Sequence, residues 1–431
     1  MNFPVPSPRL RMLMILCSAL FAAVLSYFAA RNALADYYQD QDTRAGYEQA
    51  VRLEPADSRT WYLLGRSYLY DLERPDPGKA IEALRKSVTL DPYSAEALLD
   101  LANAYDGEGD TTLARDSYVA AQRVYPLSAD VGWSYGNFLL RQGQPDAGFA
   151  QIRKAVELEP RRASEAFALA QRAQPDVKVL LDQVVPASAA VYLPIIHTLS
   201  DAGDVETAQF VWQRLLALRQ KVLMRDMVDY VDVVNRKLGP AESTRAWQQA
   251  VSIMQNPPPP DPAGSVIWDG GFESGYDGGG YAWHYNRDAR DPQISFSESE
   301  KHSGNKSMRI LFNGRKNLNF EDVCHNIAPQ EGQTYLLTAW VKTQSLTSSE
   351  GIRLQIFVLA SPQNEVTLTD DVRGTQDWKQ LQLTWTAPPG GGFGNVCVRR
   401  RMSDMPGSNI QGAAWIDDVS LTPVPEAAGK P

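Results

Sequence analysis

The sequence contains few of the residues that build metal centres and catalytic sites. Its 431 residues include three cysteines and four histidines. Cys17, Cys324 and Cys397 lie in no CxxC or Cys/His spacing, which argues against a zinc site. The HExxH, nucleophile-elbow and phosphate-loop motifs are missing. The adjacent carboxylates Asp370 and Asp371 would point to opposite faces of a strand, so a glycoside-active enzyme is the least favoured interpretation. We predict a protein without catalytic activity.

A block of basic residues is missing as well. The chain carries 42 Lys and Arg residues against 51 Asp and Glu residues, which gives a formal net charge of −9. Nucleic acids and anionic membrane surfaces are bound through clusters of Lys and Arg, so we predict no nucleic-acid partner. The content of 44% hydrophobic and 22% charged residues is typical of globular proteins, and the length allows two or three domains.

An uncharged apolar run occupies residues 12–30, close to the roughly 20 residues that span a bilayer. Arg9 and Arg11 precede the run and favour a cytoplasmic tail over residues 1–11. We predict an inner-membrane anchor or signal helix, with the bulk of the chain periplasmic or otherwise extracytoplasmic. Because the run exceeds the usual signal-peptide core, an uncleaved anchor is favoured; cleavage near Ala33-Leu34-Ala35 would give a secreted protein.

Residues 31–255 repeat with helical periodicity. Trp61, Leu64, Gly65 and Tyr68 match the W-x2-L-G-x2-Y pattern, and the closing prolines 92, 126 and 160 follow the 34-residue period of tetratricopeptide repeats (TPR). The pattern resembles this family and predicts about six helix pairs, some degenerate, preceded by a half repeat whose first helix continues from the anchor. Stacked repeats form a concave groove, so we predict a protein partner there. The repeated aromatic residues are expected in the core.

A proline-rich segment, residues 256–264, separates this region from a second one with a different pattern. Consecutive prolines favour an extended conformation, so we predict a semi-rigid linker. Over residues 265–423 apolar and polar residues alternate in short runs, which predicts an antiparallel β-sandwich. The glycine runs 278–280 and 390–392 are predicted turns, and residues 424–431 a disordered tail.

Several motifs occur in order in the second region: Gly270-Gly-Phe-Glu273, His302-Ser-Gly304, Tyr335 to Lys342, and Trp415-Ile-Asp-Asp-Val-Ser-Leu421. They resemble the jelly-roll carbohydrate-binding modules of the galactose-binding-like superfamily. The whole chain resembles bacterial membrane-anchored TPR proteins with such a module at the C-terminus. The predicted fold is therefore multidomain and α-then-β: an N-terminal transmembrane or signal helix, an all-α TPR-like solenoid and a jelly-roll sandwich.

The resemblance implies a structural calcium ion where the first and last strands of the module meet. Its ligands would be the Gly271 carbonyl, the Glu273 carboxylate, backbone oxygens at His302 and Asn305, and Asp417. Oxygen ligands from separate segments suit calcium. The alternative is that Glu273 and Asp417 make strand-end hydrogen bonds without a metal.

One face of the sandwich is predicted to bind carbohydrate. If the aliphatic residues of each strand face the core, the opposite face carries aromatic and hydrogen-bonding side chains: Phe320, Asp322, Trp340, Lys342, Arg353, Gln355, Phe357, Arg399 and Arg401. Rings cover the C–H faces of sugars and polar groups bind hydroxyls, while the arginines suit an acidic cell-surface glycan. Alternatively these charges are solvated pairs, and the loop 276–290 covers the aromatic residues.

Cys324 and Cys397 fall on this same face, on two strands that could pair with each other in the sheet. In an oxidising compartment they would form a disulfide.

These features predict a non-catalytic extracytoplasmic adaptor with a protein-binding groove and a carbohydrate-binding sandwich, in the assembly or export of a surface polysaccharide. The alternative is a protein-interaction scaffold whose sandwich binds no sugar.

Overall fold

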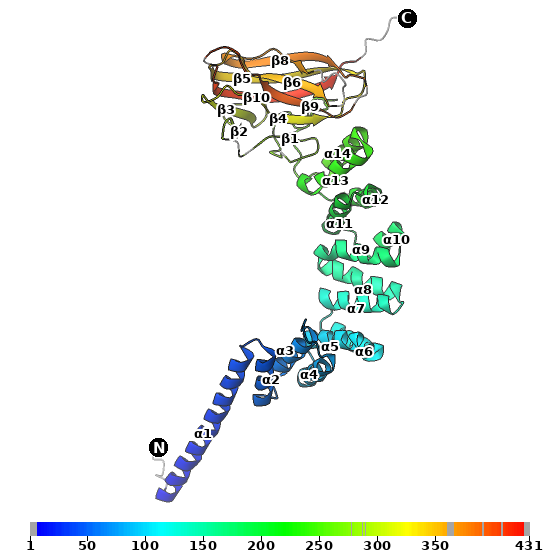
Figure 1. The fold of residues 1–431 in the computed structure, drawn as a ribbon, viewed down its shortest axis with the longest axis vertical. Coiled ribbons are helices and arrows are strands. Elements are labelled where there is room, and N and C mark those ends of the chain that lie inside the picture. The colour runs from blue at the N-terminus through cyan, green and yellow to red at the C-terminus, as the bar shows by residue number, and fades with distance from the viewer. Residues whose placement is uncertain are drawn as a thin grey trace, which may run out of the picture. The chain divides into compact units, whose positions relative to one another are not determined.

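A computed structural model describes residues 7–276, 278–286, 288, 290–359, 366–389, 392–406 and 408–425 (Figure 1). Parts of four sequence predictions lie outside these residues: the tail up to residue 6, positions 277, 287 and 289 of the covering loop, the turn at 390 and 391, and the tail from 426. The chain divides into two units, Met1–Pro186 and Ala187–Pro431, which are described separately.

The first unit is helical in its described part, and consecutive helices pair with each other. Its elements are α1 (Pro8–Gln39), α2 (Arg44–Leu53), α3 (Ser58–Leu69), α4 (Pro77–Leu90), α5 (Ala95–Gly107), α6 (Thr111–Val124), α7 (Ala129–Arg141), α8 (Pro145–Leu158), the 3-10 helix η1 (Pro160–Arg162), α9 (Ala163–Ala173) and α10 (Val177–Gln183). Short polar side chains start many of these helices by accepting a hydrogen bond from the first turn, as Asp57, Ser94 and Asp110 do.

Close helix packing explains the small residues at the repeated positions. A Cβ on Gly65 would lie 2.6 Å from Cγ of Leu84 on α4, and one on Gly136 would lie 2.7 Å from Cγ1 of Ile152 on α8. Neither position tolerates a larger side chain unless the paired helix shifts. Of the repeated aromatic residues expected in the core, Tyr68, Tyr105 and Tyr135 are buried, whereas Trp61 is half-buried.

The apolar N-terminal helix continues into the repeats. α1 runs unbroken to Gln39, packs against α2 and buries Ala35 at this contact. The helix is long and apolar enough to cross a membrane, and its length and composition fit an anchor and a signal sequence alike. The end of α1 thus serves as the first helix of the incomplete repeat.

The second unit contains further helices and the sandwich. The helices are α11 (Ala189–Ala202), α12 (Val205–Ala217), the 3-10 helix η2 (Met224–Asp226), α13 (Val228–Leu238) and α14 (Pro240–Ile253). The strands are β1 (Trp283–His284), β2 (Gln293–Ser297), β3 (Ser307–Asn313), β4 (Phe320–Ile327), β5 (Thr334–Leu346), β6 (Arg353–Val358), β7 (Thr367–Leu368), β8 (Gly374–Thr386), β9 (Gly394–Arg400) and β10 (Gln411–Pro423).

The strands form two antiparallel sheets, with the orders β1-β4-β9-β6-β7 and β2-β3-β10-β5-β8 (Figure 1). Side chains alternate between the two faces of a strand, so one set from each sheet meets in a shared core. Ile310, Val341, Ile356 and Val398 belong to this core and have no exposed surface. The predicted α-then-β fold with a jelly-roll sandwich is confirmed.

The proline-rich segment lies inside the second unit. The Asp261 carboxylate accepts hydrogen bonds from the backbone N–H groups of Asp269 and Gly270, both at 2.7 Å. The N–H of Val266 then donates to the Leu421 carbonyl on β10 at 2.9 Å. These bonds hold the entry of the sandwich beside its last strand, while the mechanical role of the prolines stays a prediction.

A loop of the sandwich contacts the last helix pair of the same unit. The Tyr281 hydroxyl lies 2.6 Å from Oγ of Ser243 on α14, and the N–H of Gly280 donates to Asp232 on α13 at 3.2 Å. A Cβ on Gly280 would lie 2.5 Å from the Trp247 ring, so glycine is required at this contact.

Candidate functional site

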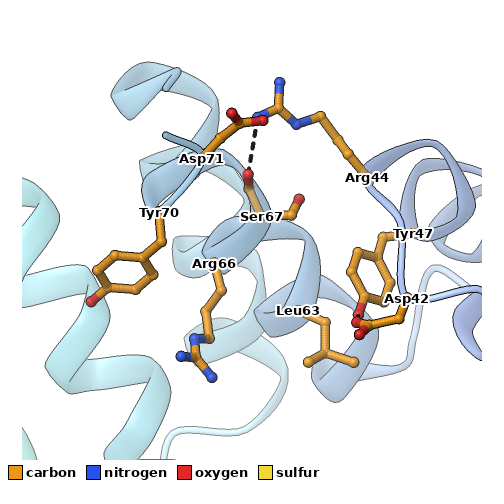
Figure 2. A pocket seen from close by; sticks show the side chains of 8 residues that line it. All are labelled: Asp42, Arg44, Tyr47, Leu63, Arg66, Ser67, Tyr70 and Asp71. Atoms are coloured by element: carbon orange, nitrogen blue, oxygen red, sulfur yellow. Dashed lines mark hydrogen bonds and ion pairs between the residues drawn. The ribbon is translucent and has the colours of Figure 1, made fainter. Parts of the chain in front are cut away.

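A cavity of about 350 Å³ opens between α2 and α3 in the first unit (Figure 2). It is lined by Asp42, Arg44, Tyr47, Leu63, Arg66, Ser67, Tyr70 and Asp71. Arg44 pairs with Asp71 and donates to the Ser67 carbonyl at 3.0 Å, so its guanidinium is held by the protein. The side chains of Arg66 and Tyr70 are half-exposed and belong to the accessible part of the cavity wall.

Arg66 and Tyr70 both contact a buried carboxylate on the next repeat. The Tyr70 hydroxyl donates to Asp100 on α5 at 2.6 Å, and Nε of Arg66 lies 3.4 Å from the other oxygen of this carboxylate. Burial raises the pKa of Asp100. The carboxylate therefore positions the two side chains in the wall of this cavity. The sequence analysis did not single out these residues, because the helical pattern marks core positions and leaves groove positions unmarked.

Ion pairs join consecutive repeats along the first unit. Each joins an arginine to an aspartate of a neighbouring repeat: Arg66 with Asp100, Arg141 with Asp106, and Arg162 with Asp130. Each pair joins opposite charges, so the pairs create no patch of one charge, and one partner of each pair is largely exposed: Arg66, Arg141 and Asp130.

The predicted carbohydrate face is partly assembled on the outer side of the β1-β4-β9-β6-β7 sheet. In the strand register Arg353 lies opposite Arg399, Gln355 opposite Cys397, and Phe357 opposite Asn395. Residues opposite each other in register share a face. The structure thus brings together the candidates of β6 and β9, and Asp322 is exposed on the adjacent β4.

The protein itself occupies several polar groups of this face. Arg353 pairs with Glu350 at 2.6 Å and Asp371 at 3.2 Å. Arg399 donates to the Phe320 carbonyl at 3.0 Å, and Gln355 is 5% exposed. Phe357 is half-buried and Arg401 is exposed, so fewer groups are accessible than the alternation suggested.

Phe320 lies in the core, so its predicted place on the polar face is wrong. Its ring contacts Phe312 at a centroid distance of 5.9 Å and is 1% exposed. The cause is a β-bulge: Phe320 pairs with Arg400 and Val323 with Val398, so β4 advances three residues where β9 advances two. An inserted residue reverses the side-chain alternation beyond it, and a period-two pattern does not reveal it.

Trp340 and Lys342 lie on the other sheet, on β5, and do not join the remaining candidates. The His302 ring stacks on Trp340 at a centroid distance of 3.9 Å and contacts Trp378 edge-on at 5.7 Å. Lys342 pairs with Glu300 at 2.9 Å. The expected single face is therefore divided between two sheets, because the alternation of a strand does not say which sheet it joins.

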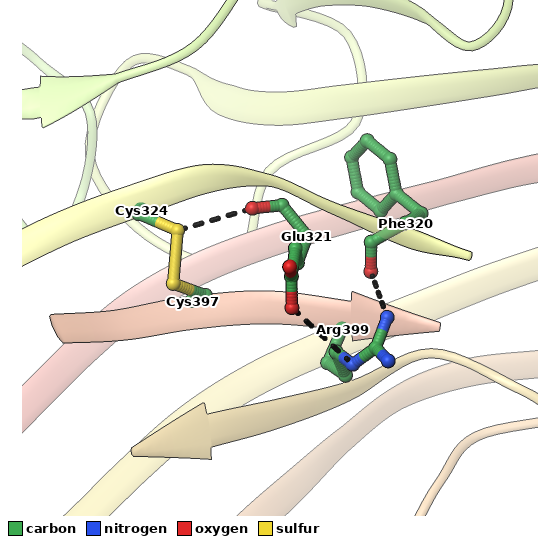
Figure 3. Close-up of a disulfide and its surroundings, with 5 residues drawn as sticks. All are labelled: Phe320, Glu321, Cys324, Cys397 and Arg399. Atoms are coloured by element: carbon green, nitrogen blue, oxygen red, sulfur yellow. Dashed lines mark hydrogen bonds and ion pairs between the residues drawn. A yellow bond between two sulfur atoms is a disulfide. The ribbon is translucent and has the colours of Figure 1, made fainter. Parts of the chain in front are cut away.

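Cys324 and Cys397 form a disulfide that crosses from β4 to β9, with an S–S distance of 2.06 Å (Figure 3). The two residues are opposite each other in the strand register. Arg399 lies further along the same strand, with Nε 3.8 Å from a carboxylate oxygen of Glu321. The crosslink therefore joins the two strands in the middle of the polar face.

The residues of the implied calcium site lie close together at the strand ends. Glu273 accepts hydrogen bonds from the backbone N–H groups of Asn305 at 2.6 Å and Lys306 at 3.2 Å. Asp417 accepts from the N–H groups of His302 at 2.7 Å and Ser303 at 3.1 Å. The carboxylates thus make the strand-end hydrogen bonds of the alternative hypothesis.

The charge at this site also suits a cation. A Cβ on Gly271 would lie 3.8 Å from an oxygen of Asp417 and 3.9 Å from one of Asp418, so two carboxylates face this backbone. Burial, together with the charge of Asp418, raises the pKa of Asp417 to about 6. Among the described residues no three His, Cys, Asp or Glu side chains could hold a metal together, so backbone oxygens would have to complete a calcium shell.

Comparisons with known proteins match one family of domains in the helical region and another in the sandwich. A model of the carbohydrate binding domain family matches residues 264–396, and a tetratricopeptide repeat model matches residues 99–177. The chain thus contains tetratricopeptide repeats followed by a carbohydrate-binding domain, and both are classes of binding domain.

Individual relatives resemble one region each. Tetratricopeptide repeat protein 33 of Mus musculus is 28% identical over 158 residues, which are 37% of this chain and 57% of that protein. The chain thus spans less than two thirds of this relative. A crystal structure of MamA protein is 18% identical, with 49% of this chain and 93% of that chain covered and a TM-score of 0.29. The structure of Family 16 Carbohydrate Binding Module-2 is 20% identical, with 36% and 99% covered and a TM-score of 0.25.

Proposed function

We propose that this protein is a membrane-anchored extracytoplasmic adaptor, whose repeats bind a protein and whose sandwich binds a glycan. The observation that carries the proposed location is the disulfide between Cys324 and Cys397 in a chain that begins with the apolar helix α1. Disulfides persist in oxidising compartments outside the cytoplasm. An adaptor of this kind would suit the assembly or export of a surface polysaccharide.

Binding of carbohydrate is proposed for the outer face of β4, β9 and β6. The matched family supports it, and so does the half-buried Phe357 ring, which lies on this face opposite Asn395 of β9, while the exposed Asp322 lies further along the same face on β4. The test is the mobility of the full chain in native gels that contain surface polysaccharide. Retardation of the wild type that is lost in Phe357→Ala, and kept in the exposed-residue control Lys379→Ala, is the expected result.

A second candidate function is a scaffold whose sandwich binds no sugar. It is favoured by the engagement of Arg353 and Arg399 with protein groups and by the burial of Gln355. A glycan array on which the full chain binds no saccharide would establish this function and refute the adaptor.

Binding of a protein partner is proposed for the groove cavity with Arg66 and Tyr70. Crosslinking in intact envelopes, from a photoreactive residue introduced at Leu63, should yield one dominant adduct. Replacing Tyr70 with Ala should abolish this adduct, whereas Tyr93→Ala, an exposed tyrosine outside the cavity, should leave it unchanged. An adduct pattern that does not depend on Tyr70 would contradict the assignment of this cavity.

Calcium binding at the strand ends remains part of the proposal. Glu273, Asp417 and backbone oxygens at Gly271, His302 and Asn305 would hold the ion. Its charge would balance the buried Asp417 carboxylate and the half-buried Asp418 carboxylate beside it. The melting temperature of the sandwich should rise in calcium relative to chelator, and Asp417→Asn should remove this difference. An identical melting temperature in both buffers would exclude the ion.

A further inference from the structure

A cavity of about 610 Å³ lies at the other sheet, away from the face of β4, β9 and β6. Its lining consists of Phe296, Ser297, Glu298, Ser299, Arg309 and Trp415. In the strand register Trp415 on β10 lies opposite Arg309 on β3, which in turn lies opposite Ser295 on β2. The indole and the guanidinium therefore share the outer face of this sheet, in a cavity of the size that holds small ligands.

Two groups in this cavity have hydrogen-bond donors without acceptors in the described part of the chain. Trp415 is 5% exposed, and its indole N–H is buried and makes no hydrogen bond there. The guanidinium carbon of Arg309 lies 5.9 Å from the centroid of the Trp415 ring, and the described residues supply Arg309 with no carboxylate partner. Because no ion pair within the described residues has to be broken first, the guanidinium of Arg309 can bind an anionic ligand.

The cation on the other side of Trp415 provides an internal comparison. Lys342 on β5 also lies opposite Trp415, but Glu300 at 2.9 Å and Asp377 at 3.2 Å neutralise its charge. Arg309 is therefore the flanking cation whose charge remains available. Arg353, on the face of β4, β9 and β6, resembles Lys342 in this respect, because it already pairs with two carboxylates.

We propose that this cavity binds an acidic saccharide through a uronate carboxylate on Arg309. A guanidinium presents paired donors that match a carboxylate, and the match to a carbohydrate-binding family favours a sugar acid as the carrier of this carboxylate. The exposed Glu298 and Ser299 accept hydrogen bonds from the sugar hydroxyls. This inference rests on the proposed carbohydrate-binding function and places a second, charge-selective site on the opposite sheet.

The test is calorimetric titration of the full chain with tetragalacturonate, and with its methyl ester, which has the same rings without the charge. The wild type should bind the acid at least tenfold more tightly than the ester, and added salt should weaken binding of the acid. Arg309→Gln should lose at least tenfold in affinity for the acid. Lys342→Gln and the exposed-residue control Lys379→Ala should stay within twofold of the wild type.

Other outcomes separate this inference from the proposed function. Equal binding of the acid by Arg309→Gln and wild type would overturn it, provided that hydrogen exchange shows both sandwiches folded. If Arg309→Gln fails to fold, Arg309→Lys, which keeps the charge but loses the paired donors, takes its place. Phe357-dependent binding of neutral glycans, without binding of the acid, would refute this site but leave the proposed function intact. Failure to bind any glycan would refute both. Tighter binding of tetraglutamate than of the acid would show a peptide site instead.

Discussion

The helical repeats and the β-sandwich keep their polar side chains in different places. In the repeats, ion pairs such as Arg141 with Asp106 lie at the surface and join neighbouring repeats. In the sandwich, Arg400, His325 and Asp417 are all fully buried and contact segments that are distant in sequence. Repeats depend on local contacts between neighbours. The sandwich additionally depends on buried polar groups that have partners only when the whole domain is folded.

This difference predicts that replacing a buried arginine of the sandwich lowers the free energy of unfolding more than replacing an exposed arginine of the repeats. Arg400 is fully buried and donates to Asn317 at 2.7 Å and to Ser348 at 2.6 Å. Its replacement by Met would leave buried acceptors unpaired and lower the free energy of unfolding of the sandwich by about 4 kcal/mol. Arg141→Met, at a side chain 55% exposed, should cost under about 1 kcal/mol.

Hydrogen exchange of the full chain measures both losses, from the amides of β9 for Arg400 and of α7 for Arg141. Similar losses of stability in β9 and α7 would show that the sandwich does not depend on buried polar groups more than the repeats do.

The crosslink of the sandwich has no equivalent in the described repeats, so its removal should affect one region. Replacing both Cys324 and Cys397 with Ser should lower the stability of the sandwich by roughly 3 kcal/mol, because the unfolded chain becomes less constrained. Exchange in β4 and β9 should accelerate, while exchange in α3 to α8 stays unchanged. Cys17→Ser, at the free exposed cysteine, is the control. Unchanged exchange in β4 would contradict the prediction.

His325 should contribute an acid-dependent loss of stability in the sandwich; Asp269 and Asp417 oppose it, because burial raises the pKa of each of these aspartates to about 6. Burial lowers the pKa of His325 to about 3, whereas the unfolded value lies near 6.5. The unfolded chain therefore binds the proton first, and stability is lost as pH falls below 6.5. At pH 5 the loss that His325 alone contributes, relative to pH 8, is about 2 kcal/mol.

The pH dependence is measured by denaturant unfolding of the sandwich in the wild type and in His325→Gln, which should be less sensitive by this amount. His197→Gln, at a side chain 58% exposed in the helical part, serves as the control. Equal pH dependence of wild type and His325→Gln would exclude the role of His325.

The smallest expected effect concerns the close helix contacts of the repeats. Gly65→Ala places a Cβ 2.6 Å from Leu84 and should cost about 1 to 2 kcal/mol, detected as faster exchange in α3 and α4. Gly107→Ala, where a Cβ meets nothing within 4 Å, should be neutral or slightly stabilising. Because repeats contact only their neighbours, α7 and α8 should not respond to Gly65→Ala; a response there would mean that cooperativity extends further along the repeats.

Some features of the candidate site were predictable from sequence and others were not. The meeting of Glu273, Asp417 and the turn at His302 was implied by the resemblance to the carbohydrate-binding modules, and hydrogen bonds hold both carboxylates at this turn. The partners of Arg353 and Arg399 were not predictable, because Glu350, Asp371 and Asn319 are brought to them by strand ends and loops. The same holds for Asp100, which reaches Arg66 and Tyr70 only when consecutive repeats stack.

The residue pattern alone was sufficient for the α-then-β fold, the apolar N-terminal helix and the repeats, because helix and strand periods are properties of neighbouring residues. Tertiary structure decided which strands share a sheet, and therefore separated Trp340 from Phe357. It also placed Phe320 in the core, through a bulge that the alternation does not reveal. It brought Trp415 and Arg309 together at one cavity, because strand pairing joins residues that are distant in the chain.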